Sequence, residues 1–153
     1  MIEMLISGSI IICLLVLSWI DLRTMTLPDP LTYCLIVIGF LSNHYSWIQW
    51  TSSSDSLLGA LAGFFLLYGT NFLYKVVRKQ DGIGLGDAKL LAGLGACLGF
   101  ESLILILFIA SITGLVGGWL WLKINHLKNS HPFPFGPYIA FSGIILIIAK
   151  ILH

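Results

Sequence analysis

Charged side chains are scarce in this sequence, and their scarcity excludes several kinds of protein. Asp, Glu, Lys and Arg make up 10% of its 153 residues, whereas a soluble domain carries roughly 25%. Apolar residues reach 58%, and the mean hydropathy is +0.97. A net charge of +1 provides no basic face for nucleic acid, so we expect no nucleic-acid partner. The composition predicts a single membrane-embedded domain, residues 1–153, in contact with a lipid bilayer.

Cysteine is sparse as well. Cys13, Cys34 and Cys97 lie far apart within apolar runs, and no CxxC pair occurs. This pattern indicates neither a disulfide framework nor a zinc site, and the histidines show no metal-ligand spacing. We therefore expect no metal and no cofactor. The first ten residues lack the basic segment of a secretory signal peptide, and no small-residue cleavage site follows them, so we expect a retained anchor.

Long apolar runs are what the sequence has in abundance, and they predict an all-α, polytopic membrane helix bundle. The six predicted spans are 4–20, 31–50, 57–77, 88–100, 102–122 and 138–152. A straight crossing needs about 20 residues. The fourth run is the shortest, so we expect it to start below the membrane surface or to borrow residues beyond Glu101.

Basic residues are distributed unequally between the two ends of these spans. Because positive residues concentrate on the cytoplasmic side of a membrane protein, the unequal distribution predicts sidedness. It places the first, third and fifth connections in the cytoplasm and both termini outside. Only Lys150 lies at the outer end, and seven basic residues lie at the inner end: Arg23, Lys75, Arg78, Lys79, Lys89, Lys123 and Lys128.

Within the predicted spans, glycine pairs spaced four residues apart occur three times, at Gly59–Gly63, Gly95–Gly99 and Gly114–Gly118. Glycines at this spacing allow the backbones of two helices to approach closely in lipid. The pairs predict a tightly packed bundle.

Two aspartates are the main candidates for chemistry. Asp21 ends the first span and Asp87 begins the fourth, with two crossings between their connections, so both should reach the cytoplasmic face at similar depth. Acidic residues at a membrane edge are costly to keep and are candidate functional groups. Two carboxyl groups that share a site cannot easily both ionise, so the pair offers a base and an acid together. These are the groups that aspartic proteases use, with no metal or cofactor.

Helix position suggests an asymmetry between the two carboxyl groups. Asp87 should lie at the positive N-terminal end of a helix, close to Lys89, whereas Asp21 should lie at a negative C-terminal end. We therefore predict that Asp87 is the more anionic partner.

The glycines before Asp87 also favour a site. Gly82, Gly84 and Gly86 can adopt positive φ and permit close approach of another backbone. We expect an extended substrate to lie along them by strand-like pairing.

Three segments together carry a family resemblance. In this order and spacing, WIDLRTMTLPDPLTY (19–33), GIGLGDAKLLAGLGACLG (82–99) and PFGPYIA (134–140) resemble the type IV prepilin peptidases, a group of GxGD membrane aspartic endopeptidases. The resemblance covers residues 8–150 and implies that Asp21 and Asp87 are the catalytic pair. Asp29 then reads as a turn or cap residue. Lys89 either tunes the charge of the site or contacts the substrate, or it is a lysine whose side chain reaches the membrane interface. The PFGP segment is expected to form a rigid turn.

The resemblance also implies the substrate and the location. The substrates would be prepilins or pseudopilins, each with a short basic leader, a glycine before the scissile bond and a hydrophobic helix. The enzyme would lie in the bacterial inner membrane with its active site facing the cytoplasm. A type IV pilus, type II secretion and competence are equally compatible with the sequence, and it does not indicate an oligomeric state.

One departure from the family pattern concerns methylation. Many members carry an additional N-terminal region with CxxC motifs and an N-methyltransferase activity. This sequence begins at the first span and has no CxxC. We therefore expect a short form that cleaves but does not methylate.

Two other functions remain open at this point. Presenilin-like and signal-peptide-peptidase-like GxGD proteases have a Tyr-Asp element and a Pro-Ala-Leu element. This chain has Ile20-Asp21 and Pro-Phe-Gly-Pro (134–137) at the corresponding places, which argues against this alternative. A proton-coupled membrane transport protein would need polar side chains at several depths. The polar residues within the spans are mainly Asn43, His44, Thr70 and Asn71, which read more simply as interhelical hydrogen bonds.

Overall fold

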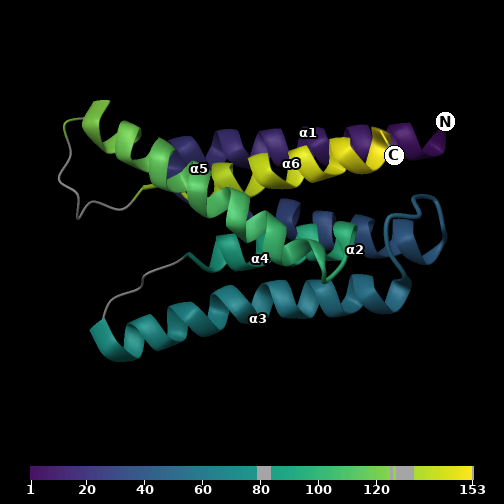
Figure 1. Cartoon of the computed structure of the whole chain (residues 1–153), viewed down its shortest axis with the longest axis horizontal. Helices are drawn as coiled ribbons and strands as arrows, with labels where there is room; N and C mark the ends of the chain where they lie inside the picture. The colour runs from purple at the N-terminus through teal and green to yellow at the C-terminus, as the bar shows by residue number, and fades with distance from the viewer. Residues whose placement is uncertain (79–83, 125, 127–132, 153) are drawn as a thin grey trace.

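The computed structural model describes residues 1–78, 84–124, 126 and 133–152. These residues form six α-helices and no β-strand (Figure 1). The predicted all-α fold is therefore confirmed. The helices are α1 (Ile2–Thr24), α2 (Asp29–His44), α3 (Ser53–Arg78), α4 (Leu85–Leu98), α5 (Ser102–Ile124) and α6 (Gly136–Leu152).

Three of the helices are long and apolar enough to cross a bilayer. They are α1, α3 and α5, with candidate spans of 23, 25 and 23 residues, and α6 is a shorter apolar helix. Each of the three spans has only 28% of its apolar window buried inside the protein. Large apolar side chains such as Leu115, which is 77% exposed, therefore cover the outside of the bundle. This is the surface of a polytopic helical membrane protein.

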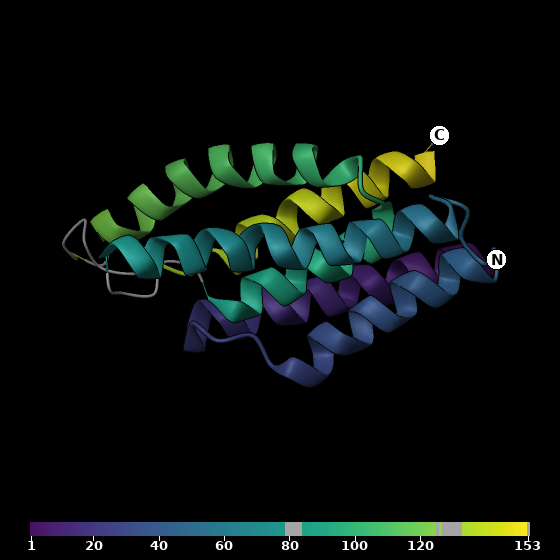
Figure 2. The same cartoon turned by 90° about the horizontal axis from the view of Figure 1, so that it is seen from below.

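Consecutive helices run in alternating directions, so α1 begins and α6 ends at the same end of the bundle (Figure 1). We call this the terminus end. The ends of α1, α3 and α5 and the starts of α2, α4 and α6 lie at the opposite end, called the far end. Figure 2 shows α3 running along the length of the bundle in the middle of the view, with α2 and α5 at opposite edges. Arg23, Lys75 and Lys123 are on the last turns of their helices at the far end, and Lys150 is at the terminus end.

α4 is an internal helix. From Asp87 to Leu98 every residue except Lys89 is buried, and α4 packs against α2, α3, α5 and α6. Its 14 residues extend about 21 Å at 1.5 Å per residue, less than the roughly 30 Å hydrocarbon core. Because other helices surround α4, its length need not match the bilayer. The fourth element can therefore be short, as predicted, because it lies inside the bundle and not against the lipid.

The helix boundaries differ from the predicted spans by up to six residues, and two of these differences matter for the fold and the site. α2 ends at His44, and the chain then turns through Ser46, whose φ is 54°. Ile48 and Trp50, which extended the predicted span to residue 50, are buried in this turn with exposed fractions of 0% and 7%. The predicted end of this span at residue 50 is therefore wrong, because the apolar residues of a buried loop raised the hydropathy beyond the end of the helix. α4 begins at Leu85, so Asp87 lies in its first turn and not before it.

The glycine pairs have two different partners. A Cβ on Gly59 would collide with the backbone of Gly95, and a Cβ on Gly63 would lie 2.8 Å from the carbonyl oxygen of Leu91. The predicted close approach is therefore confirmed between α3 and α4. Gly114 and Gly118 face the side chains of Phe135 and Phe133 instead of a helix backbone, so at that pair α5 packs against aromatic rings.

Buried polar side chains stabilise the terminus end of the bundle. Asn43 Nδ2 donates to the carbonyl oxygens of Ala96 and Cys97 at 3.1 and 2.9 Å, and Ser56 Oγ donates to Ala96 O at 2.5 Å. These contacts join α2 and α3 to α4. The expected interhelical role of Asn43 is confirmed, whereas the hydroxyl of Thr70 bonds within its own helix to Leu67 O.

Candidate active site

The far end of the bundle brings Asp21 and Asp87 together. Asp21 lies in the last turn of α1, Asp87 in the first turn of α4, and Gly136 is the first residue of α6. A Cβ built on Gly136 would lie 2.7 Å from Asp21 Oδ2 and 3.3 Å from Asp87 Oδ1. These two carboxyl oxygens are therefore at most about 6 Å apart, the sum of the two distances. The alternating order of the helices predicts this meeting.

Both carboxyl groups are buried. Asp21 is 5% exposed and Asp87 is 8% exposed, and Leu17, Leu27 and Ala88 are among the buried apolar residues near them in sequence. Two carboxyl groups in one buried site oppose each other's ionisation, so one proton shared between them is the favourable state. Such a pair has one group that can accept a proton and one that can donate it. Within the described residues no group of three or more His, Cys, Asp or Glu side chains could hold a metal ion.

The two described glycines before Asp87 have different surroundings. Neither Gly84 nor Gly86 adopts the positive φ that glycine permits. Gly86 is needed for packing, because a Cβ there would lie 2.8 Å from Leu27 Cβ. The Leu27 side chain therefore packs directly against the α4 backbone at Gly86. Gly84, by contrast, is exposed beside the carboxyl group, where a Cβ would lie 3.8 Å from Asp87 Oδ2. Gly82 lies outside the described residues.

Asp29 and Lys89 form an ion pair that links α2 to α4. Lys89 Nζ lies 2.6 Å from Asp29 Oδ1 and 5.2 Å from the ring centre of Tyr33. Asp29 is the first residue of α2, after Pro28, where a negative charge favours the helix N-terminus. The N-cap position is Pro28 and no side chain makes a capping hydrogen bond there, so Asp29 lies one residue inside α2, next to the predicted cap position. The sequence did not reveal its pairing with Lys89, because the two residues are 60 positions apart.

Comparison with known proteins adds a family to this geometry. Residues 9–119 match the model of the type IV leader peptidase family. The chain belongs to the type IV leader peptidase family. The matched region includes most of α1, all of α2 to α4 and most of α5, and so contains both aspartates. The resemblance seen in the sequence is confirmed.

The relatives have longer chains. The sequence is 37% identical over 135 residues to a prepilin leader peptidase/N-methyltransferase of Pseudomonas aeruginosa and 39% identical over 138 residues to one of Aeromonas hydrophila. Each alignment covers 88% of this chain but 46% of the relative. A Burkholderia pseudomallei relative of the same name is 39% identical, with 85% and 41% covered. The chain thus spans less than half the length of these relatives. No solved structure matches it.

Gly136 is the residue of this candidate site that sequence reasoning missed. Its backbone N–H donates to Asp21 Oδ2 at 3.1 Å. We expected residues 134–137 to form only a rigid turn into the last helix. The available signal was a glycine between two prolines, on a connection that arrives at the same end of the bundle as Asp21 and Asp87.

The contact with Gly136 also removes the basis for the predicted charge asymmetry. That prediction placed only Asp87 at the N-terminal end of a helix. In the structure both carboxyl groups lie at such an end, Asp87 in the first turn of α4 and Asp21 against the first residue of α6. Helix position therefore does not distinguish the two groups.

The structure predicts a small role for Asp29. The Asp29 side chain is 56% exposed, and exposed ion pairs contribute about 0–1 kcal/mol. Changing Asp29 to Asn should therefore alter the rate of leader cleavage by less than about fivefold, which corresponds to 1 kcal/mol. Initial rates in membranes that contain equal amounts of each variant measure the effect. A loss as large as that of Asp87→Asn would place Asp29 in the catalytic machinery.

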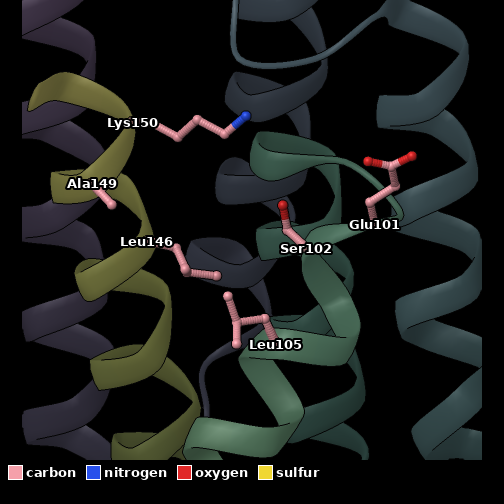
Figure 3. Close-up of a pocket in the computed structure, with 6 residues that line it drawn as sticks. All are labelled: Glu101, Ser102, Leu105, Leu146, Ala149 and Lys150. Carbon is pink, nitrogen blue, oxygen red and sulfur yellow. The ribbon is translucent and has the colours of Figure 1, made fainter. Parts of the chain in front are cut away.

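A pocket at the terminus end is separate from these residues. It lies between the start of α5 and the end of α6 (Figure 3), and its lining residues are Glu101, Ser102, Leu105, Leu146, Ala149 and Lys150. None of the far-end residues contributes to it. It is therefore not the candidate active site.

Proposed function

We propose that this protein is an aspartic endopeptidase that removes the leader peptide from type IV prepilins or prepilin-like pseudopilins. Asp21 and Asp87 are its catalytic pair. The observation that carries the proposal is the burial of two carboxyl groups, at most about 6 Å apart, where α1, α4 and α6 meet. The relatives' names support the substrate class, since they are called prepilin leader peptidases.

The paired carboxyl groups account for hydrolysis of a peptide bond. The ionised group accepts a proton from a water molecule as the water oxygen attacks the carbonyl carbon, and the protonated group donates its proton to the carbonyl oxygen. The resulting tetrahedral species then breaks the C–N bond: the pair donates its proton to the leaving nitrogen and takes one back from a hydroxyl of the tetrahedral carbon as the new carboxyl group forms. Each turnover consumes one water and restores the shared proton. No metal or cofactor takes part.

The substrate reaches this site from the cytoplasm. Arg23, Lys75, Lys89 and Lys123 lie at the same end of the bundle as the pair, and Lys150 lies at the other. By the positive-inside rule this end faces the cytoplasm of a bacterial inner membrane. The exposed Gly84 lies beside Asp87, and we assign it to the surface that the substrate backbone approaches. Lys89 and Asp29 support the start of α4 through their ion pair.

Cleavage from one face of the membrane tests the whole proposal. Inverted vesicles that carry the protein should cut an added prepilin-type substrate at the bond after its leader glycine, and sealed right-side-out vesicles should not. The products are identified by mass spectrometry. A matched substrate with the leader glycine replaced by a bulky residue should remain intact. No cleavage in either orientation would contradict the proposed activity, and cleavage only from the outer face would contradict the sidedness.

A further inference from the structure

We propose that the backbone N–H of Gly136 is a positioning group that holds Asp21 opposite Asp87. The inference rests on the proposed function, because it concerns the same two carboxyl groups. The N–H donates to Asp21 Oδ2 at 3.1 Å, and both groups are buried. A carboxyl group on the last turn of a helix has two rotatable bonds, so one fixed donor restricts which way it faces.

The first turn of α6 leaves this N–H free for Asp21. The N–H groups of Tyr138 and Ile139 both donate to Phe135 O, at 3.1 and 3.3 Å, and Pro137 has no N–H. Of the first four residues of α6, Gly136 thus supplies the N–H that reaches another element. N–H groups at a helix start lack intrahelical partners and point toward acceptors with negative charge.

Only glycine fits at this position. A Cβ on residue 136 would lie 2.7 Å from Asp21 Oδ2 and 3.1 Å from its Cγ, and it would also lie 3.3 Å from Asp87 Oδ1. The first distance is shorter than real Cβ contacts, so at least the Asp21 side chain would have to move. The φ of Gly136 is not positive. The requirement for glycine is therefore space beside the two carboxyl groups, and not backbone conformation.

Aromatic side chains on both sides of Gly136 fix its place. Phe133, Phe135 and Tyr138 form a cluster with ring centres 6.3–6.5 Å apart. The Phe133 ring is edge-on to the other two, at interplanar angles of 87° and 66°. Such arrangements are favourable for aromatic rings. Because the cluster flanks Gly136 in the chain, it holds the backbone at this residue.

The aromatic cluster lies on a glycine face of α5. A Cβ on any of three α5 glycines would lie less than 3.0 Å from a ring atom, so the rings reach the helix backbone there. A chain of contacts thus runs from α5 through the rings and Gly136 to Asp21. The individual contacts are Gly118 with Phe133, Gly114 with Phe135 and Gly117 with Tyr138.

Removing the N–H without changing shape tests the inference. Glycolic acid in place of Gly136, introduced by cell-free translation, exchanges the N–H for an ester oxygen and adds no atom. We expect kcat to fall at least about tenfold, while KM changes less than about twofold, because the donor orients a catalytic group and does not hold the substrate. A kcat within about twofold of the wild-type value would overturn the inference.

Crowding the same position is the second arm. Gly136→Ala keeps the N–H but displaces the carboxyl groups, and we expect kcat to fall by about a hundredfold or more. Gly8→Ala is the matched control. It lies on α1 like Asp21, but a Cβ there would have no neighbour within 4 Å, so kcat should not change. The thermal unfolding temperature in detergent should be alike for the wild type, Gly136→Ala and Gly8→Ala.

The outcomes separate this inference from the proposed function. If the wild-type chain cuts no prepilin-type substrate, the proposed function fails. If the wild-type chain cuts but the ester at residue 136 retains full kcat, the positioning role fails and the function stands. If Gly136→Ala does not fold, the ester protein, which adds no atom, still decides the question.

Discussion

Asp21→Asn and Asp87→Asn will each reduce the rate of leader cleavage by at least about a thousandfold. An amide keeps the size and hydrogen-bonding capacity of the carboxyl group but cannot exchange a proton with water or with the substrate. Loss of a general acid or base typically costs about 10²–10⁴ in rate. Here the upper part of that range applies, because the two groups act as one unit. Initial rates with a purified prepilin-type substrate measure the loss.

The same two variants should be folded as well as the wild type. Two buried carboxyl groups oppose each other and cost stability, so replacing one by a neutral amide should leave the unfolding temperature unchanged or raise it. Glu101→Gln is the matched control, since Glu101 lies at the terminus end, far from the pair. It should cleave at the wild-type rate. If either aspartate variant also did so, Asp21 and Asp87 would not be the catalytic pair.

Gly95→Leu will destabilise the bundle more than any other single change considered. The backbones of α3 and α4 touch at Gly59 and Gly95, where a Cβ on Gly95 would lie 2.5 Å from the carbonyl carbon of Gly59. The clash is with backbone, which cannot rotate away as a side chain can. Overpacking a core costs about 1–3 kcal/mol and occasionally more. We expect the free energy of unfolding to fall by about 3 kcal/mol, measured by denaturant titration in mixed micelles.

Gly69→Leu provides the comparison for this stability prediction. Gly69 is exposed on α3, and a Cβ there would have no neighbour within 4 Å. Its substitution should not lower the free energy of unfolding, because it displaces no neighbour and leucine favours a helix over glycine by up to about 1 kcal/mol. Equal effects of Gly95→Leu and Gly69→Leu would show that α3 and α4 are not in close contact.

The order of the helices was predictable from the sequence, and with it the meeting of the two aspartates. Apolar runs located every helix, and the even number of crossings between Asp21 and Asp87 brought both to the same end. The end of α2 was not predictable from hydropathy. The apolar residues Ile48 and Trp50 are buried in a turn of the protein. Hydropathy does not distinguish residues buried in protein from residues that face lipid.

The details of the site depend on contacts between residues far apart in the sequence. Gly136 and Asp21 are 115 positions apart, and Asp29 and Lys89 are 60 apart. Periodicity and motifs describe only neighbours, so neither pairing was visible. Gly86 shows the same effect, because the motif did not reveal that its neighbour is Leu27. The two aspartates and the glycines before Asp87 could be identified from the sequence, but neither the role of Gly136 nor the contacts that each residue makes could be.

Isotope incorporation during a single round of cleavage tests the central claim most directly. Purified protein in lipid vesicles is mixed with a prepilin-type substrate in water enriched in oxygen-18, and the products are weighed by mass spectrometry. We predict one cut, after the leader glycine, with one oxygen-18 atom in the new carboxyl group of the leader, and no product from Asp21→Asn or Asp87→Asn. Cleavage at wild-type rate by either variant, or a cut at another bond, would contradict the account.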